Sequence, residues 1–133
     1  MNLSGSILEN LARVAAAHAE VRAVYPFGSQ VKGDALPDSD LDVGVLFEGP
    51  QLLGHTLALE TELQPAAGRG FDLVDARRAA AFLALEIVRG ERIFCREPVE
   101  TDLFELYVLR RAGDLLPFER QRQALLRVVD AKE

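Results

Sequence analysis

Short strand-like runs alternate with helical stretches along the chain, and this alternation restricts the possible fold more than any other sequence feature. Strand-like runs, rich in β-branched and aromatic residues, cover residues 21–27, 41–47, 71–74 and 92–95. Helical stretches are expected over residues 6–18, 50–64, 79–88, from Pro98 onward, and from Phe118 to about Val129. The pattern predicts an α/β (α+β) fold, with a small mixed β-sheet of about four strands flanked by helices.

The length and charge of the chain set further limits. With 133 residues, the chain suits one domain over residues 1–133, with C-terminal helices from about 98 to 131. It carries 15 Lys and Arg against 21 Asp and Glu, a formal net charge of −6. This balance disfavours non-specific binding to nucleic acid or to an anionic membrane surface. We therefore expect no direct nucleic-acid partner and no membrane.

Several protein classes are excluded by what the sequence does not contain. No apolar run approaches the roughly 18 residues that a membrane span needs. The start of the chain has no basic region and reaches an acid at Glu9, unlike a secretory signal. The single Cys95, with His18 and His55, disfavours a cysteine- or histidine-based metal centre. We expect a cytoplasmic protein.

Three aspartates occupy equivalent places in strand-like runs. Asp40 and Asp42 stand two residues apart, so strand geometry puts both on one face with Cα atoms about 6.5–7 Å apart. Asp72 has the same placement in the next run. If the strands carrying Asp42 and Asp72 are neighbours, three carboxylates meet and repel one another unless a cation compensates. Because Mg²⁺ binds one or two carboxylates together with substrate phosphates, the pattern predicts a divalent-metal site.

The first strand-like run ends in a turn suited to phosphate. Gly28 lets the backbone turn sharply and approach a ligand closely. The amides and hydroxyl that follow at Ser29, at the start of a short helix, suit phosphate oxygens, and Lys32 adds a charge for a triphosphate. A Gly-Ser pair alone marks a turn, and Asp-x-Asp alone is common on solvated strands. Their joint spacing favours a nucleotide and metal site.

The same residues carry a resemblance to a known family. Gly28-Ser29, ten intervening residues and then Asp40-Leu41-Asp42 resemble the signature of the DNA polymerase β-like nucleotidyltransferase superfamily. The run YPFGSQVKGDALPDSDLDVGVLFE resembles minimal nucleotidyltransferases (MNT) of bacteria and archaea. The runs FDLVDARRA, GERIFCRE and FELYVLRRAGDL resemble MntA-like adenylyltransferase antitoxins of HEPN/MNT toxin–antitoxin systems. The resemblance implies the polymerase β-like palm fold.

For the metal site, the resemblance implies an enzyme that transfers AMP from ATP. Asp40 and Asp42 would bind two Mg²⁺ ions, and Asp72 would complete the site and accept the proton of the attacking hydroxyl. Two such ions would stabilise the attacking and leaving oxygens of an in-line displacement at the α-phosphorus.

For the nucleotide, the resemblance assigns Gly28 and Ser29 to the β- and γ-phosphates of ATP. The family often has two basic residues after the Gly-Ser pair, whereas here the first position is Gln30 and only Lys32 remains. Ser39, directly before Asp40, would cap the loop or contact phosphate.

The resemblance also implies a partner, a HEPN-domain RNase toxin whose hydroxyl, expected to be a tyrosine, receives AMP. Two alternatives stay open: an antitoxin that neutralises its partner by docking alone, and a nucleotidyltransferase for a small molecule. Apolar residues of the C-terminal helices would serve a homodimer or a toxin interface. The first of these helices is expected to have an apolar side formed by Leu103, Phe104, Tyr107 and Val108.

Overall fold

The protein is described by a computed structural model over residues 5–28 and 40–131. Within these residues the elements follow one another as α1 (Gly5–Ala16), β1 (Val21–Phe27), β2 (Leu41–Phe47), α3 (Leu53–Ala67), β3 (Phe71–Asp75), α4 (Ala81–Val88), β4 (Phe94–Cys95) and α5 (Pro98–Ala131). The four predicted strands are all present. The last is shorter than expected, because only two of its residues pair with β1.

The strands form one mixed sheet in the order β3-β2-β1-β4. β1 pairs antiparallel with β2 and with β4, whereas β2 and β3 run parallel. The parallel register sets Leu41 opposite Phe71 and Asp42 opposite Asp72. The predicted fold class, a small mixed sheet flanked by helices, is confirmed.

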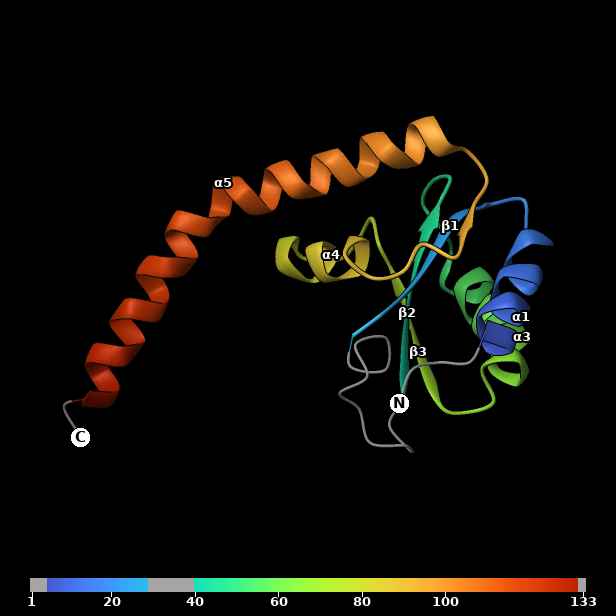
Figure 1. Cartoon of the computed structure of the whole chain (residues 1–133), viewed down its shortest axis with the longest axis horizontal. Coiled ribbons are helices and arrows are strands. Elements are labelled where there is room, and N and C mark those ends of the chain that lie inside the picture. Colours follow the sequence, from blue (N-terminus) through green and yellow to red (C-terminus); the bar gives the residue numbers. More distant parts are fainter. Residues whose placement is uncertain (1–4, 29–39, 132–133) are drawn as a thin grey trace.

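Helices cover both faces of the sheet (Figure 1). On one face, strand residues such as Leu41 and Val43 pack with Leu59 of α3 in one buried cluster, which α1 also joins. On the other face, Tyr25 packs in a second cluster with Ile87 of α4 and part of α5. Because strand side chains alternate between faces, Asp42 lies on the face that α4 and α5 cover.

The C-terminal region corrects the prediction of two helices. It forms one 34-residue helix, α5, with Pro117 inside it. A helix-interior proline loses one backbone hydrogen bond and bends the helix without necessarily ending it, and α5 changes direction along its length as it leaves the body (Figure 1). Thr101, Val108 and Ala112 are buried, but none of residues 113–128 is buried. Only the first half of α5 therefore packs on the rest of the chain.

The prediction that four residues form an apolar, buried side of this helix is correct for two of them. Val108 is buried and Phe104 is partly buried, as predicted. Leu103 and Tyr107 are 61% and 57% exposed, because α4 contacts a different side of the helix. Tyr107 therefore does not belong to the core.

Polar contacts fix the first half of α5 to the sheet. The buried Tyr25 hydroxyl donates to Glu105 Oε2 at 2.6 Å. Arg92, in the segment before β4, donates to Glu105 at 2.9 Å and to Asp102 at 2.7 Å. These contacts join β1 and the β4 segment to one side of the helix.

Helix α3 also departs from the prediction, which placed it over residues 50–64. It begins at Leu53 and continues through Pro65 to Ala67. Gly68 ends it with a left-handed φ of 68°, and its N–H donates to the Gln64 carbonyl at 3.2 Å. The helix does not end at Pro65, because the loss of one backbone N–H can be tolerated in the last turn. It ends at the Gly68 cap.

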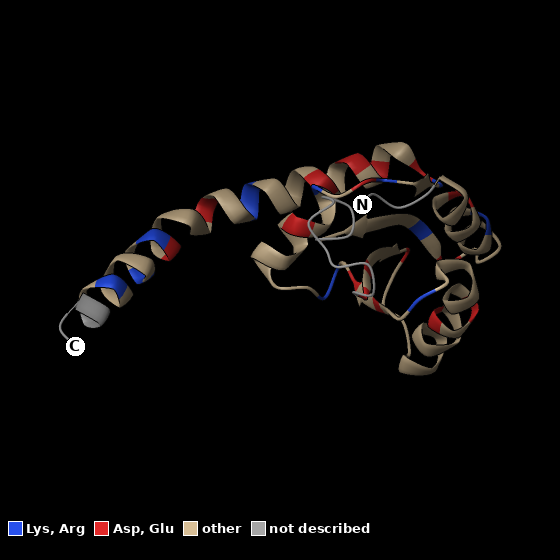
Figure 2. Cartoon of the chain, turned by 60° about the horizontal axis from the view of Figure 1, so that its bottom comes forward, with Lys and Arg blue, Asp and Glu red and all other residues tan. Residues whose placement is uncertain are grey.

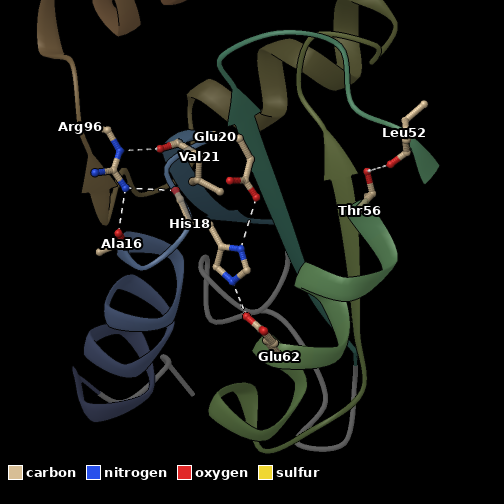
Figure 3. Close-up of polar contacts among 8 residues, drawn as sticks. All are labelled: Ala16, His18, Glu20, Val21, Leu52, Thr56, Glu62 and Arg96. Carbon is tan, nitrogen blue, oxygen red and sulfur yellow. Dashed lines mark hydrogen bonds and ion pairs between the residues drawn. The ribbon is translucent and has the colours of Figure 1, made fainter. Parts of the chain in front are cut away.

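His18 and Arg96 secure the turn between α1 and β1 (Figure 3). The His18 ring contacts the carboxylates of Glu20 and Glu62, the latter from α3. Arg96 donates to the backbone carbonyls of this turn, which belong to Ala16, His18 and Val21. Both ring nitrogens of His18 are thus occupied by carboxylates. No helix in the described part of the chain combines the length and apolarity needed to cross a membrane.

Candidate functional site

Asp42 and Asp72 lie side by side on the sheet face below α4. They are paired positions of the parallel β2–β3 ladder, where neighbouring backbones lie about 4.8 Å apart and side chains point to the same face. The sequence argument depended on these strands being neighbours, and the register confirms that they are. Asp72 is exposed, whereas Asp42 is partly buried.

Two glycines lie directly against the aspartates. Gly28, at the end of β1, has a φ of +84°, and a Cβ placed there would stand 2.9 Å from Asp42 Oδ2. Gly70, just before β3, is even closer to Asp40, since a Cβ placed there would stand 2.5 Å from Asp40 Oδ1. The backbone at the end of β1 thus approaches the Asp42 carboxylate more closely than a side chain would allow.

A fourth acid, Glu86, reaches this site from α4. Burial raises the pKa of Asp42, and the negative charges of Asp72, Glu86 and Asp40 raise it further. Glu86 precedes Ile87, which packs on Gly44 of β2, so α4 lies close over this part of the sheet. Sequence reasoning missed Glu86. Its one local signal is that it is the lone acid in the apolar helix AFLALEIV.

The donor chemistry of the site fits a hard divalent cation. The predicted meeting of three carboxylates is not found, because among residues 5–28 and 40–131 no group of three or more His, Cys, Asp and Glu side chains could hold a metal ion by itself. A cation here would need ligands beyond these side chains. The carboxylates of Asp40, Asp42 and Asp72 supply oxygen donors. The pKa of Asp42 is raised first by burial and then by neighbouring negative charges, and a cation would offset those charges. Mg²⁺ typically takes one or two carboxylates and completes its shell with water and phosphate oxygens. The residues present fit an ion shared with a phosphate-bearing ligand.

Part of the predicted nucleotide site lies outside the described residues. This applies to Ser29, Lys32 and Ser39, and to the short helix expected after Gly28. The structure therefore brings together Gly28, Asp42 and Asp72, with Asp40 at the edge of β2. The roles of all these residues remain predictions.

A family comparison identifies the fold. The family model described as "Polymerase beta, Nucleotidyltransferase" matches residues 9–99, well over half of the chain. The chain belongs to this family. The matched segment contains the two glycines and all four acids of the site. The domain is thus a nucleotidyltransferase with the polymerase β-like fold, as the motif predicted. A search of curated protein sequences finds no match.

Solved structures of toxin–antitoxin systems share this nucleotidyltransferase fold. A chain of a toxin–antitoxin crystal structure with AMP-PNP is 22% identical, with a TM-score of 0.72, covering 92% of this chain and 97% of that one. A chain of the complex between a tri-AMPylated Shewanella oneidensis HEPN toxin and an MNT antitoxin is 22% identical, with a TM-score of 0.69 and coverages of 92% and 95%. A proposed minimal nucleotidyltransferase is 33% identical over 62% of this chain and 84% of its own, with a TM-score of 0.52.

Proposed function

We propose that this nucleotidyltransferase is an antitoxin that transfers AMP from ATP to a hydroxyl, a tyrosine in our proposal, of a HEPN-domain RNase toxin in the cytoplasm. The single domain, residues 1–133, would hold ATP and two Mg²⁺ ions, and the toxin would supply the acceptor. The proposal depends above all on one observation, the pairing of Asp42 with Asp72 beside the end of β1.

The chemistry assigned to these residues is an in-line displacement. The acceptor oxygen attacks the α-phosphorus of ATP, the bond from that phosphorus to the oxygen bridging to the β-phosphate breaks, and pyrophosphate leaves. Bound Mg²⁺ would neutralise phosphate charge and lower the pKa of the acceptor hydroxyl. Asp72 is our candidate to accept the hydroxyl proton, because it is exposed and lies next to Asp42.

Asp40 and Asp42 are the candidate metal ligands in this scheme. Gly28 keeps the backbone at the end of β1 against the Asp42 carboxylate, so phosphates held by that turn would lie near the carboxylates. Ser29, Lys32 and Ser39 are assigned to the phosphates by the family signature. Positioning and charge make most of the catalytic contribution in phosphoryl chemistry.

The fold relatives support a protein acceptor over a small molecule. One of them is in complex with a tri-AMPylated HEPN toxin, and another structure contains AMP-PNP. These chains are covered almost completely by this one. The second candidate function is neutralisation of the toxin by docking alone, which the exposed apolar residues of α5 favour.

An intact-mass assay distinguishes AMP transfer from neutralisation by docking alone. The protein is mixed with ATP, Mg²⁺ and the HEPN protein encoded beside it, and transfer appears as an increase of that partner's mass by whole AMP units. Asp42→Asn should abolish transfer, and Asp72→Asn should reduce its rate by about a hundredfold or more. Glu48→Gln is the matched control, since Glu48 is an exposed acid just beyond the opposite end of β2.

Undiminished transfer by Asp42→Asn would refute the assignment of the site. Toxin inhibition without a change in mass, and equal inhibition by Asp42→Asn, would establish docking as the mode of neutralisation. Loss of transfer in Glu48→Gln as well would indicate a general effect of removing acids.

A further inference from the structure

Two adjoining hollows follow one flank of α5, and Tyr107 lines both. The first has a volume of about 650 Å³ and is lined by Arg22, Arg77, Glu100, Leu103, Phe104 and Tyr107. The second has a volume of about 450 Å³ and is lined by Tyr107, Arg110, Arg111, Asp114 and Leu115. We refer to these residues together as the α5 groove.

Arg77 is held in place inside this groove, and its Nε is the one side-chain nitrogen that donates a hydrogen bond to another described residue. Its Nε donates to the Phe47 carbonyl at 2.8 Å, and its Cζ lies 5.7 Å from the centre of the Phe104 ring. Within the described part of the chain, no carboxylate pairs with this guanidinium. Arg22 differs, because it pairs with Glu100 at 2.9 Å. A guanidinium that is already positioned loses little freedom when it binds a carboxylate.

The second hollow adds positive charge and apolar surface. Arg110 and Arg111 are exposed and form no ion pair with another described residue. Figure 2 shows basic residues along the projecting part of α5, with acidic residues between them. Leu103 and Tyr107, on the same flank, are more than half exposed. Exposed Tyr, Arg and apolar side chains together are typical of protein–protein interfaces.

We propose that the α5 groove binds a segment of a partner protein in which carboxylates alternate with apolar side chains. Arg77, Arg110 and Arg111, which form no ion pair with any described residue, complement carboxylates. Leu103 and Tyr107 complement apolar groups. A protein segment fits this mixture better than a nucleic acid, because the chain as a whole carries a charge of −6.

The groove is remote from the acidic site. Arg22 is the second residue of β1, whereas Gly28 follows its last residue, and the six residue steps between them span about 20 Å of extended strand. A partner held in the groove would leave Asp42 and Asp72 accessible. The inference goes beyond the proposed transfer reaction, since it concerns only where a protein partner is held.

Fluorescence anisotropy with a synthetic probe tests the proposal. The probe is a short fluorescein-labelled peptide in which Glu alternates with Leu and Phe, and the control peptide has Lys in place of Glu. Binding is measured in EDTA without ATP, so a failure of the proposed transfer reaction does not affect the result. We expect saturable binding of the Glu peptide that weakens as salt increases.

Variants locate the binding site. Arg77→Gln and Arg111→Gln should each raise the Kd by about tenfold, the loss expected for one charged hydrogen bond. Arg127→Gln, an exposed arginine of α5 outside the groove, should leave the Kd unchanged. Arg77→Lys keeps the charge but loses the planar fork, so it should fall between Arg77→Gln and wild type. Thermal unfolding confirms that each variant is folded.

Several results would overturn the proposal. One is no binding of the Glu peptide, and another is equal binding of the Lys peptide. A third is the same Kd for Arg77→Gln and Arg127→Gln. Displacement of the probe by single-stranded oligonucleotide would assign the groove to nucleic acid. A dimer of the protein that Arg77→Gln dissociates, measured by light scattering, would make a second copy the occupant.

Discussion

Replacing Gly28 with alanine tests why the end of β1 needs glycine. Two effects act at this position. Its φ of +84° is strained for any residue with a Cβ, and the new methyl group would stand 2.9 Å from Asp42 Oδ2. Gly68→Ala is the matched control, because Gly68 has a φ of +68° but no atom within 4 Å of its added Cβ.

The two variants should lose similar stability but differ in activity. A left-handed alanine costs roughly 1–2 kcal/mol, and 1 kcal/mol lowers the Tm of a domain of this size by about 4 °C. At Gly28 the Asp42 carboxylate must also move by about 0.5 Å to restore ordinary van der Waals contact. Since a misplacement of about 1 Å can reduce a rate by about a hundredfold, AMP transfer should fall by about tenfold or more.

Differential scanning fluorimetry measures the Tm, and the intact-mass assay measures the rate of AMP transfer. Both variants should show a lower Tm, and only Gly28→Ala should lose transfer. Equal transfer rates for Gly28→Ala and Gly68→Ala would refute the argument that contact with Asp42 explains the glycine.

Two further predictions concern stability. Asp42→Asn should raise the Tm at pH 7. The pKa of Asp42 is raised in the folded protein, so the folded protein binds this proton more tightly than the unfolded chain and loses stability as the pH rises through that pKa. Asparagine carries no charge and avoids this loss. This gain in Tm should vanish below about pH 4. An equal gain at pH 7 and below pH 4, measured by differential scanning fluorimetry, would contradict the prediction. Gly44→Ala would place a methyl group against Ile87 and should lower the free energy of unfolding by about 1–3 kcal/mol in urea titrations. Gly54→Ala, in open space on α3, should leave it unchanged or raise it by up to about 1 kcal/mol, and equal losses would contradict the packing argument.

Local patterns predicted the strands well, because side-chain alternation depends only on the geometry of neighbouring residues. The segments at β1 and β2 match their predictions residue for residue. Helix ends were predicted less well. The helix expected over residues 50–64 continues through Pro65 to Ala67, and the two expected C-terminal helices form one helix with Pro117 inside it. A proline removes one hydrogen bond, and the remaining turns of the helix can outweigh that loss.

Contacts between distant segments explain what was missed at the site. Glu86 has no motif around it. It affects Asp42 only because Ile87, the next residue of α4, packs against Gly44 of β2. The exposure of Tyr107 has a similar cause. Helical spacing identified an apolar stripe on α5, but α4 covers a different side of that helix.

By itself, the sequence determined that Asp42 and Asp72 stand in strands and that Gly28 ends a strand at a sharp turn, and it predicted that Asp40 shares a face with Asp42. These properties follow from backbone geometry over a few residues. Only the tertiary structure decided that Asp42 is paired with Asp72 and touches Gly28. Strand order and register depend on how the whole chain buries its apolar faces, so segments thirty residues apart meet only once the sheet and its helices have packed.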